Sequence, residues 1–133
     1  MKMLASLICT MGLSALAFAQ GGASAPPANV APADAKDHVG EVAMVCGKVV
    51  DTKIAKYGLA GYGKPVLFDL DQPEPDPVFY FVSFGSKGGG PDEVIAAYKG
   101  KSVCVTGKIT LASGRPYIMA NDRTKIKPQA ANQ

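Results

Sequence analysis

Short apolar segments separated by glycine and proline constrain the fold of this chain more than any other feature. Five of them have the composition of β-strands, at residues 41–54, 65–71, 78–84, 102–111 and 116–121. The intervening stretch QPEPDP contains three prolines, which lack the backbone donors of a strand interior. The sequence therefore predicts an all-β domain of short, consecutive strands.

A single helix is predicted in the segment PDEVIAAYKG, between the third and fourth strands. Pro91 suits its first turn, Gly100 suits its C-terminal cap, and Val94, Ile95 and Tyr98 form an apolar stripe. The order β-β-β-α-β-β is that of the OB-fold, a five-stranded Greek-key barrel. An SH3-like barrel is the alternative, but it normally lacks a full helix at this position.

The first 19 residues have the pattern of a secretory signal peptide. Lys2 provides a positive start, residues 4–18 are apolar and uncharged, and Ala17-Phe18-Ala19 fits the small-x-small cleavage rule. The sequence predicts cleavage after Ala19 and a periplasmic or secreted protein. The apolar run is shorter than the ~20 residues of a membrane helix, so no membrane span is expected in the mature chain.

The rest of the chain divides by composition. Residues 20–37 are rich in Ala, Pro and Gly and predict a flexible linker, with one helical turn at 33–38. Residues 38–127 form the expected OB-fold domain, and residues 128–133 a disordered tail. The mature chain would carry 13 Lys and Arg against 11 Asp and Glu, a balance that neither demands nor excludes a polyanionic partner.

Two cysteines, Cys46 and Cys104, remain after removal of the leader. They lie in the similar phrases VCGKVVD and VCVTGKIT, in the first and fourth strands. If these strands pair so that Cys46 faces Cys104, Val45 faces Val105 and a disulfide becomes feasible. An even cysteine pair in an exported chain favours that bond. Two buried free thiols, or a redox or metal role, are the alternatives.

The sequence contains few of the residue patterns that indicate a catalytic or metal site. His38 is the only histidine, so neither a catalytic triad nor a four-ligand zinc site can be assembled around it. A turn-stabilising role is expected for it. Acidic residues gather at the turn after the second strand, where a solvated hairpin end is favoured over a weak calcium site. We expect a protein that is not an enzyme and that needs no cofactor or metal.

The face used by OB-folds is the candidate binding site. OB-fold ligands lie across strands two and three, between the loops joining strands one and two and strands four and five. The aromatic and basic residues expected there are Lys53, Lys56, Tyr57, Tyr62, Lys64, Tyr80, Lys108, Arg115 and Tyr117. On the third strand, Phe79 and Phe81 are expected inside the barrel and Tyr80 outside. Rings interleaved with cations suit single-stranded nucleic acid.

The domain also resembles a family of exported bacterial OB-fold proteins, described as nucleic-acid-binding-like and related to the tRNA-anticodon-binding OB group. The resemblance spans His38 to Ile118. The motifs that carry it are HVG at 38–40, VCG at 45–47, GKP at 63–65, YKGKSVCVTGKI at 98–109 and GRPYI at 114–118. The chain departs from the family pattern in the acidity of the turn between the second and third strands.

Two classes of function follow. The first is a module that binds single-stranded nucleic acid or a nucleotide by stacking and charge. The second is a protein-interaction or envelope-stress module with a protein partner, and small-ligand or oligosaccharide binding also suits an OB face. Neither the ligand nor the oligomeric state follows from the sequence.

Overall fold

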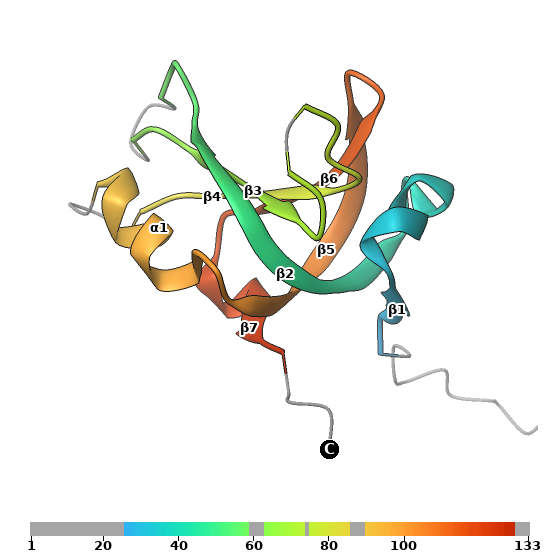
Figure 1. The fold of residues 1–133 in the computed structure, drawn as a ribbon. Helices are drawn as coiled ribbons and strands as arrows, with labels where there is room; N and C mark the ends of the chain where they lie inside the picture. The colour runs from blue at the N-terminus through green and yellow to red at the C-terminus, as the bar shows by residue number, and fades with distance from the viewer. Residues whose placement is uncertain (1–25, 59–62, 74, 86–89, 130–133) are drawn as a thin grey trace, which may run out of the picture.

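The described part of the protein is a small β-barrel with one α-helix (Figure 1). The computed structural model describes residues 26–58, 63–73, 75–85 and 90–129. In chain order the elements are β1 (Ala28–Val30), η1 (Pro32–His38), β2 (Val42–Ile54), β3 (Val66–Leu70), β4 (Tyr80–Ser83), α1 (Pro91–Tyr98), β5 (Ser102–Ala112), β6 (Arg115–Ala120), η2 (Arg123–Lys125) and β7 (Ile126–Pro128). Within these residues no helix has the length and apolarity needed to cross a membrane.

Five strands close the barrel in the order β2-β3-β4-β6-β5, and a β2–β5 ladder joins the ends. β4 and β6 pair in parallel, whereas the other neighbouring barrel strands are antiparallel. The chain crosses from the third barrel strand, β4, through α1 to the fourth, β5, which lies beside the first. The fifth strand, β6, then returns between β4 and β5, and this is Greek-key connectivity. The predicted OB-fold is therefore confirmed.

Two short strands extend the barrel and correct the predicted boundaries. β1 pairs in parallel with residues 43–45 of β2, and β7 pairs with residues 103–105 of β5. The chain is ordered at residues 28–38, where a linker was expected, because β1 and η1 pack there with Val30 and Ala35 buried. The helical turn expected at 33–38 is present as η1. Because β1 precedes the barrel, α1 lies between β4 and β5, which are still the third and fourth barrel strands.

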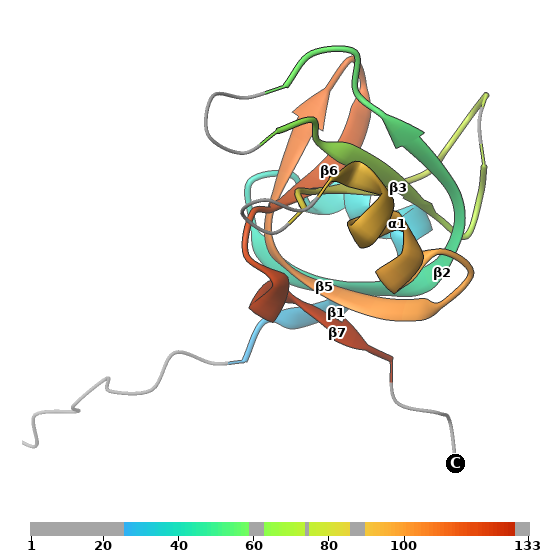
Figure 2. The same ribbon diagram turned by 90° about the vertical axis from the view of Figure 1, so that its left-hand side faces the viewer.

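The strand order leaves room for these additions. β3 occupies one edge of β2 only from Val49 to Ile54, so the earlier part of that edge is open to β1. β6 likewise pairs with the end of β5 and leaves the beginning to β7. Both described ends of the chain therefore leave from the same side of the barrel (Figures 1 and 2).

The barrel interior is aliphatic and aromatic. Phe79 and Phe81 are fully buried, as predicted, and Phe68 stacks on Phe81 with ring centroids 4.7 Å apart. α1 lies over one end of the barrel (Figure 2), where Tyr98 meets the edges of both rings at 5.7 and 6.1 Å. Val94 is fully buried beside it. The predicted helical stripe thus closes the phenylalanine-filled end of the core.

The two cysteine phrases are neighbouring strands. In the β2–β5 ladder Cys46 is directly opposite Cys104, and Val45 is opposite Val105. The sulfurs are bonded, and the Cα atoms are 4.0 Å apart. The predicted register and disulfide are both confirmed.

The glycines of these phrases are required by close packing. A Cβ on Gly107 would lie 2.6 Å from Cγ2 of the buried Ile118, and one on Gly47 would lie 2.8 Å from Oδ1 of Asp71. That Asp71 oxygen accepts the backbone N–H of Lys48 at 2.8 Å. The register shift of β2 falls between Val49 and Asp51, beyond Gly47.

Candidate functional site

The outer surface of β3, β4 and β6 forms the face on which OB-folds bind ligands. Cross-strand neighbours point to the same side of a sheet, so the ladder registers define rows of side chains. One outer row consists of Asp51, Asp69, Tyr80, Tyr117 and Thr110, and a second consists of Lys53, Leu67, Val82 and Met119. Between them runs the buried row that contains Phe68, Phe81 and Ile118.

A pair of stacked tyrosines occupies the centre of this face. Tyr80 and Tyr117 are paired in the parallel β4–β6 ladder. Their ring centroids are 5.2 Å apart and their planes differ by 10°. Burial raises the pKa of the Tyr80 hydroxyl, and the neighbouring Tyr117 raises it further. The pair is a pre-formed aromatic platform, half-buried in the face and reached from solvent.

Arg115 adds a cation beside this platform. It lies two residues before Tyr117 on the same face of β6. Its Nη2 donates to the backbone oxygen of Pro75 at 2.8 Å, so the guanidinium links the β5–β6 hairpin to the loop between β3 and β4. Arg115 opposes the rise in the pKa of Tyr80, which indicates that its charge reaches the ring.

Carboxylates lie on the other side of the platform. Asp69 pairs with Tyr80 across the β3–β4 ladder and with Asp51 across the β2–β3 ladder. Asp69 is 5% exposed, and its charge raises the pKa of Tyr80. Asp51 accepts the backbone N–H of Thr52 at 2.9 Å. The platform is therefore bordered by positive charge at Arg115 and by negative charge at the two aspartates.

The end of β2 and the loop between β2 and β3 supply the second group of predicted residues. Lys53 is exposed in the outer row that contains Leu67. Lys56 and Lys64 are exposed, and Tyr57 is 76% exposed, with the Lys56 Nζ 5.6 Å from its ring centroid. Tyr62 lies outside the described residues. In Figure 1 the loop that follows β2 and the β5–β6 hairpin stand apart on opposite sides of the view.

Lys108 does not join the other predicted residues. β5 continues to Ala112 before a tight turn in which Ser113 and Gly114 both have positive φ. Lys108 is therefore inside the strand, within the predicted range 102–111, and lies opposite Val42 in the β2–β5 ladder instead of at the face where it was expected. Its side chain is exposed on the part of the barrel that carries the disulfide.

Some residues of the site were missed by sequence reasoning. Asp69 could have been placed on the outer face, since it follows a core phenylalanine in an alternating strand. Its pairing with Asp51 requires the β2–β3 register. Among the described residues no group of three or more His, Cys, Asp or Glu could hold a metal ion. His38 instead bonds Glu41, with Nδ1 2.7 Å from Oε2.

Fold and site together define an OB-fold protein whose outer sheet face carries an aromatic pair flanked by charges of both signs. No protein-family model matches the chain, and no curated protein matches it. Among solved structures, the chain is similar to one described as an aspartyl-tRNA synthetase of Leishmania major Friedlin, with 12% identity and a TM-score of 0.44. The match covers 75% of this chain but 21% of that one.

Proposed function

We propose that the protein binds single-stranded nucleic acid or nucleotides on the outer face of β3, β4 and β6. The observation that carries the proposal is the stacked pair of Tyr80 and Tyr117, with rings 5.2 Å apart on the face that OB-folds use. Every nucleobase has an apolar face that gains from stacking on an exposed aromatic ring. A pre-formed pair loses little side-chain freedom when a base is added to it.

Charge shapes the expected affinity. Arg115 at one side and Lys53, Lys56 and Lys64 at the other can meet phosphates, whereas Asp69 beside Tyr80 opposes a phosphate directly over the rings. The backbone of a bound strand would therefore pass along the cations while its bases stack on the tyrosines. Few cations are involved, so a moderate salt dependence is expected, well below that of a duplex-binding protein.

We infer that the protein works outside the cytoplasm. The Cys46–Cys104 bond is of the kind that persists in oxidising compartments, and residues 1–19 have the pattern of a cleaved leader. Expression from the full-length gene should give a periplasmic or secreted product that begins at Gln20. N-terminal peptide mapping tests this, and a product that retains Met1 in the cytoplasm would contradict it.

The test of binding is fluorescence anisotropy with a labelled single-stranded oligonucleotide at rising salt. Tyr117→Leu removes the ring and should weaken binding about 5- to 150-fold, the range for loss of one stacked base. Tyr117→Phe keeps the ring and should bind like the wild type, which makes it the matched control. Absence of binding to DNA and RNA at low salt, or equal binding by the Leu and Phe variants, would refute the proposal.

A protein-binding module is the second candidate. It is favoured by Leu67 and Met119, which are accessible in the outer row beside the tyrosines, with the buried Val82 between them. Such a row could accept apolar side chains of an extended peptide, and this binding would change little with salt. Oligonucleotide binding that is absent at low salt would leave this candidate ahead.

A further inference from the structure

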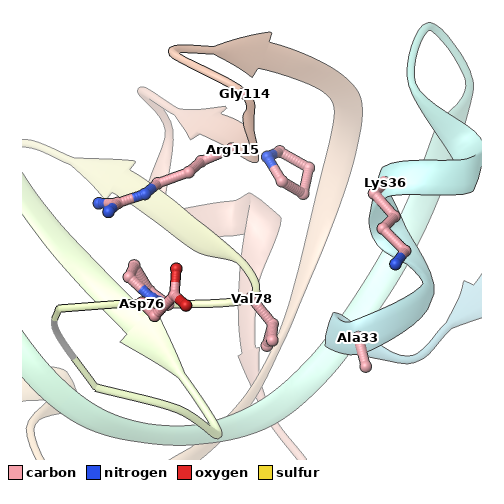
Figure 3. A pocket seen from close by; sticks show the side chains of 8 residues that line it. Ala33, Lys36, Asp76, Val78, Gly114 and Arg115 are labelled. Atoms are coloured by element: carbon pink, nitrogen blue, oxygen red, sulfur yellow. The ribbon is translucent and has the colours of Figure 1, made fainter.

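A small cavity lies beside the aromatic platform, where three separate segments meet. It is lined by Ala33 and Lys36 of η1, by Asp76, Pro77 and Val78 of the β3–β4 loop, and by Gly114, Arg115 and Pro116 of the β5–β6 hairpin. Figure 3 shows Arg115 and Asp76 on one side of it and Lys36 and Ala33 on the other. Its volume is about 190 Å³.

The size of the cavity limits what it can hold. Pockets that enclose a whole small molecule usually measure about 300–1,000 Å³, so this one can take only one group of a larger ligand. Its walls at Pro77 and Pro116 are buried and are fixed by proline rings. The cavity is therefore a rigid recess for a single compact group.

Charge indicates the kind of group. Lys36 and Arg115 line the recess from opposite sides, and Figure 3 shows the guanidinium turned away from Lys36. Asp76 contributes one carboxylate, so the described lining residues carry a net positive charge. Arg115 is held toward the β3–β4 loop by its hydrogen bond to Pro75. A compact anion fits this lining better than an apolar or cationic group.

The recess lies close enough to the stacked tyrosines for one nucleotide to reach both. Arg115 and Tyr117 lie on the same face of β6, two residues or about 7 Å apart along the strand. A sugar–phosphate unit can span that separation, so a nucleotide with its base on the tyrosines could place a phosphate in the recess. η1 stands at the far side through Lys36 and Ala33, where it would obstruct a chain that continued beyond the phosphate.

We propose that this recess binds the terminal phosphate of a nucleotide or oligonucleotide whose end base stacks on Tyr80 and Tyr117. The proposal rests on the function proposed above, and it adds end recognition to it. Lys36 is the residue through which it can be tested, because it lines the recess and takes no part in the platform. The Asp76 carboxylate would repel the phosphate, because it reduces the positive charge of the lining.

The experiment compares three short RNA probes of one sequence, with a 5′-phosphate, a 3′-phosphate or hydroxyls at both ends, each labelled internally. Anisotropy titrations give a dissociation constant for each probe. At least one phosphorylated probe should bind roughly tenfold more tightly than the hydroxyl probe, the gain expected from a charge-assisted contact. The probe that gains identifies which end enters the recess.

Variants separate the recess from general electrostatics. Lys36→Ala should abolish the gain while leaving the hydroxyl probe unchanged, and Asp76→Asn should enlarge the gain. Lys127→Ala removes an equal charge on β7, away from the recess, and should preserve the gain. Thermal melts of each variant establish that the fold is intact.

The outcomes distinguish the two proposals. Equal binding of phosphorylated and hydroxyl probes overturns the terminal-phosphate site and leaves nucleic-acid binding intact. A Lys36→Ala effect of the same size on every probe also overturns it, because that is the result expected of non-specific attraction. Failure of all three probes to bind overturns the proposed function, and the terminal-phosphate site with it.

Discussion

Cys46 and Cys104 are bonded across directly opposed positions of the β2–β5 ladder, with Cα atoms 4.0 Å apart. This ladder joins the first and fourth barrel strands and closes the barrel. The bond therefore fastens the seam between two segments that are 58 residues apart in the chain. For a domain of this size, with a limited core, such a link is a large part of the stability.

Removal of the bond should destabilise the protein. Closure of a loop this long in the unfolded chain is worth about 4 kcal/mol in the chain-entropy treatment, with measured losses of about 2–5 kcal/mol. Cys46→Ala/Cys104→Ala should lower the free energy of unfolding by that amount in urea titrations. The denatured, unreduced wild type should show no thiol with Ellman's reagent, and two thiols per chain would disprove the bond.

Gly107 should not tolerate a side chain. Its Cβ would lie 2.6 Å from Cγ2 of the fully buried Ile118, so Gly107→Ala forces the core to shift at a cost of about 1–3 kcal/mol. Gly90 has open space around its Cβ position, so Gly90→Ala is the control and should change stability by less than ~1 kcal/mol. If Gly107→Ala were as stable as the wild type in thermal melts, β5 and β6 would be able to move apart at Gly107 and Ile118, and the prediction would be wrong.

Ser83 carries a buried hydroxyl with an unused hydrogen-bonding capacity. It lies on the inner face of β4 between Val66 and Ala120, is 1% exposed, and within the described part of the chain its Oγ has no partner. Ser83→Ala removes this burial cost and should raise the free energy of unfolding by about 1 kcal/mol. Ser102→Ala, at an exposed position of β5, is the control and should be neutral. A destabilised Ser83→Ala would reveal a partner for the hydroxyl.

Strand positions and the core could be predicted because they depend on local alternation. The phenylalanines at 79 and 81 had to share a face, and the valines beside both cysteines were compatible with the register in which Cys46 faces Cys104. β1 was not predictable, since Ala28–Val30 has the composition of a linker and pairs only because part of the β2 edge is left open. That open edge is a property of the folded barrel and leaves no trace in residues 20–37.

The binding face was predicted only in part, for the same reason. Alternation in β4 placed Tyr80 outside, but its stacking on Tyr117 requires the parallel β4–β6 register, and these strands are separated by α1 and β5. The recess was missed because Lys36 and Asp76 are brought to the hairpin by tertiary packing. Lys108 was assigned to the face although the predicted strand 102–111 contains it, and its place away from the tyrosines follows from its pairing with Val42 in the β2–β5 ladder.

The aromatic platform should make stability fall at alkaline pH. Burial raises the pKa of Tyr80 above 10.0, and Tyr117 and Asp69 add to the rise while Arg115 opposes it. Above pH 10 the unfolded chain has lost a proton that the folded chain retains, so folding stability is complete below that pH and declines as pH rises toward the folded-state pKa. Tyr80→Phe cannot ionise, so its free energy of unfolding should decline less steeply between pH 9 and 12 in urea titrations at each pH. The phenolate absorbance of the folded variant should lack a late-titrating component present in the wild type. Identical slopes, together with loss of an early-titrating component, would show that Tyr80 ionises as readily in the barrel as in water.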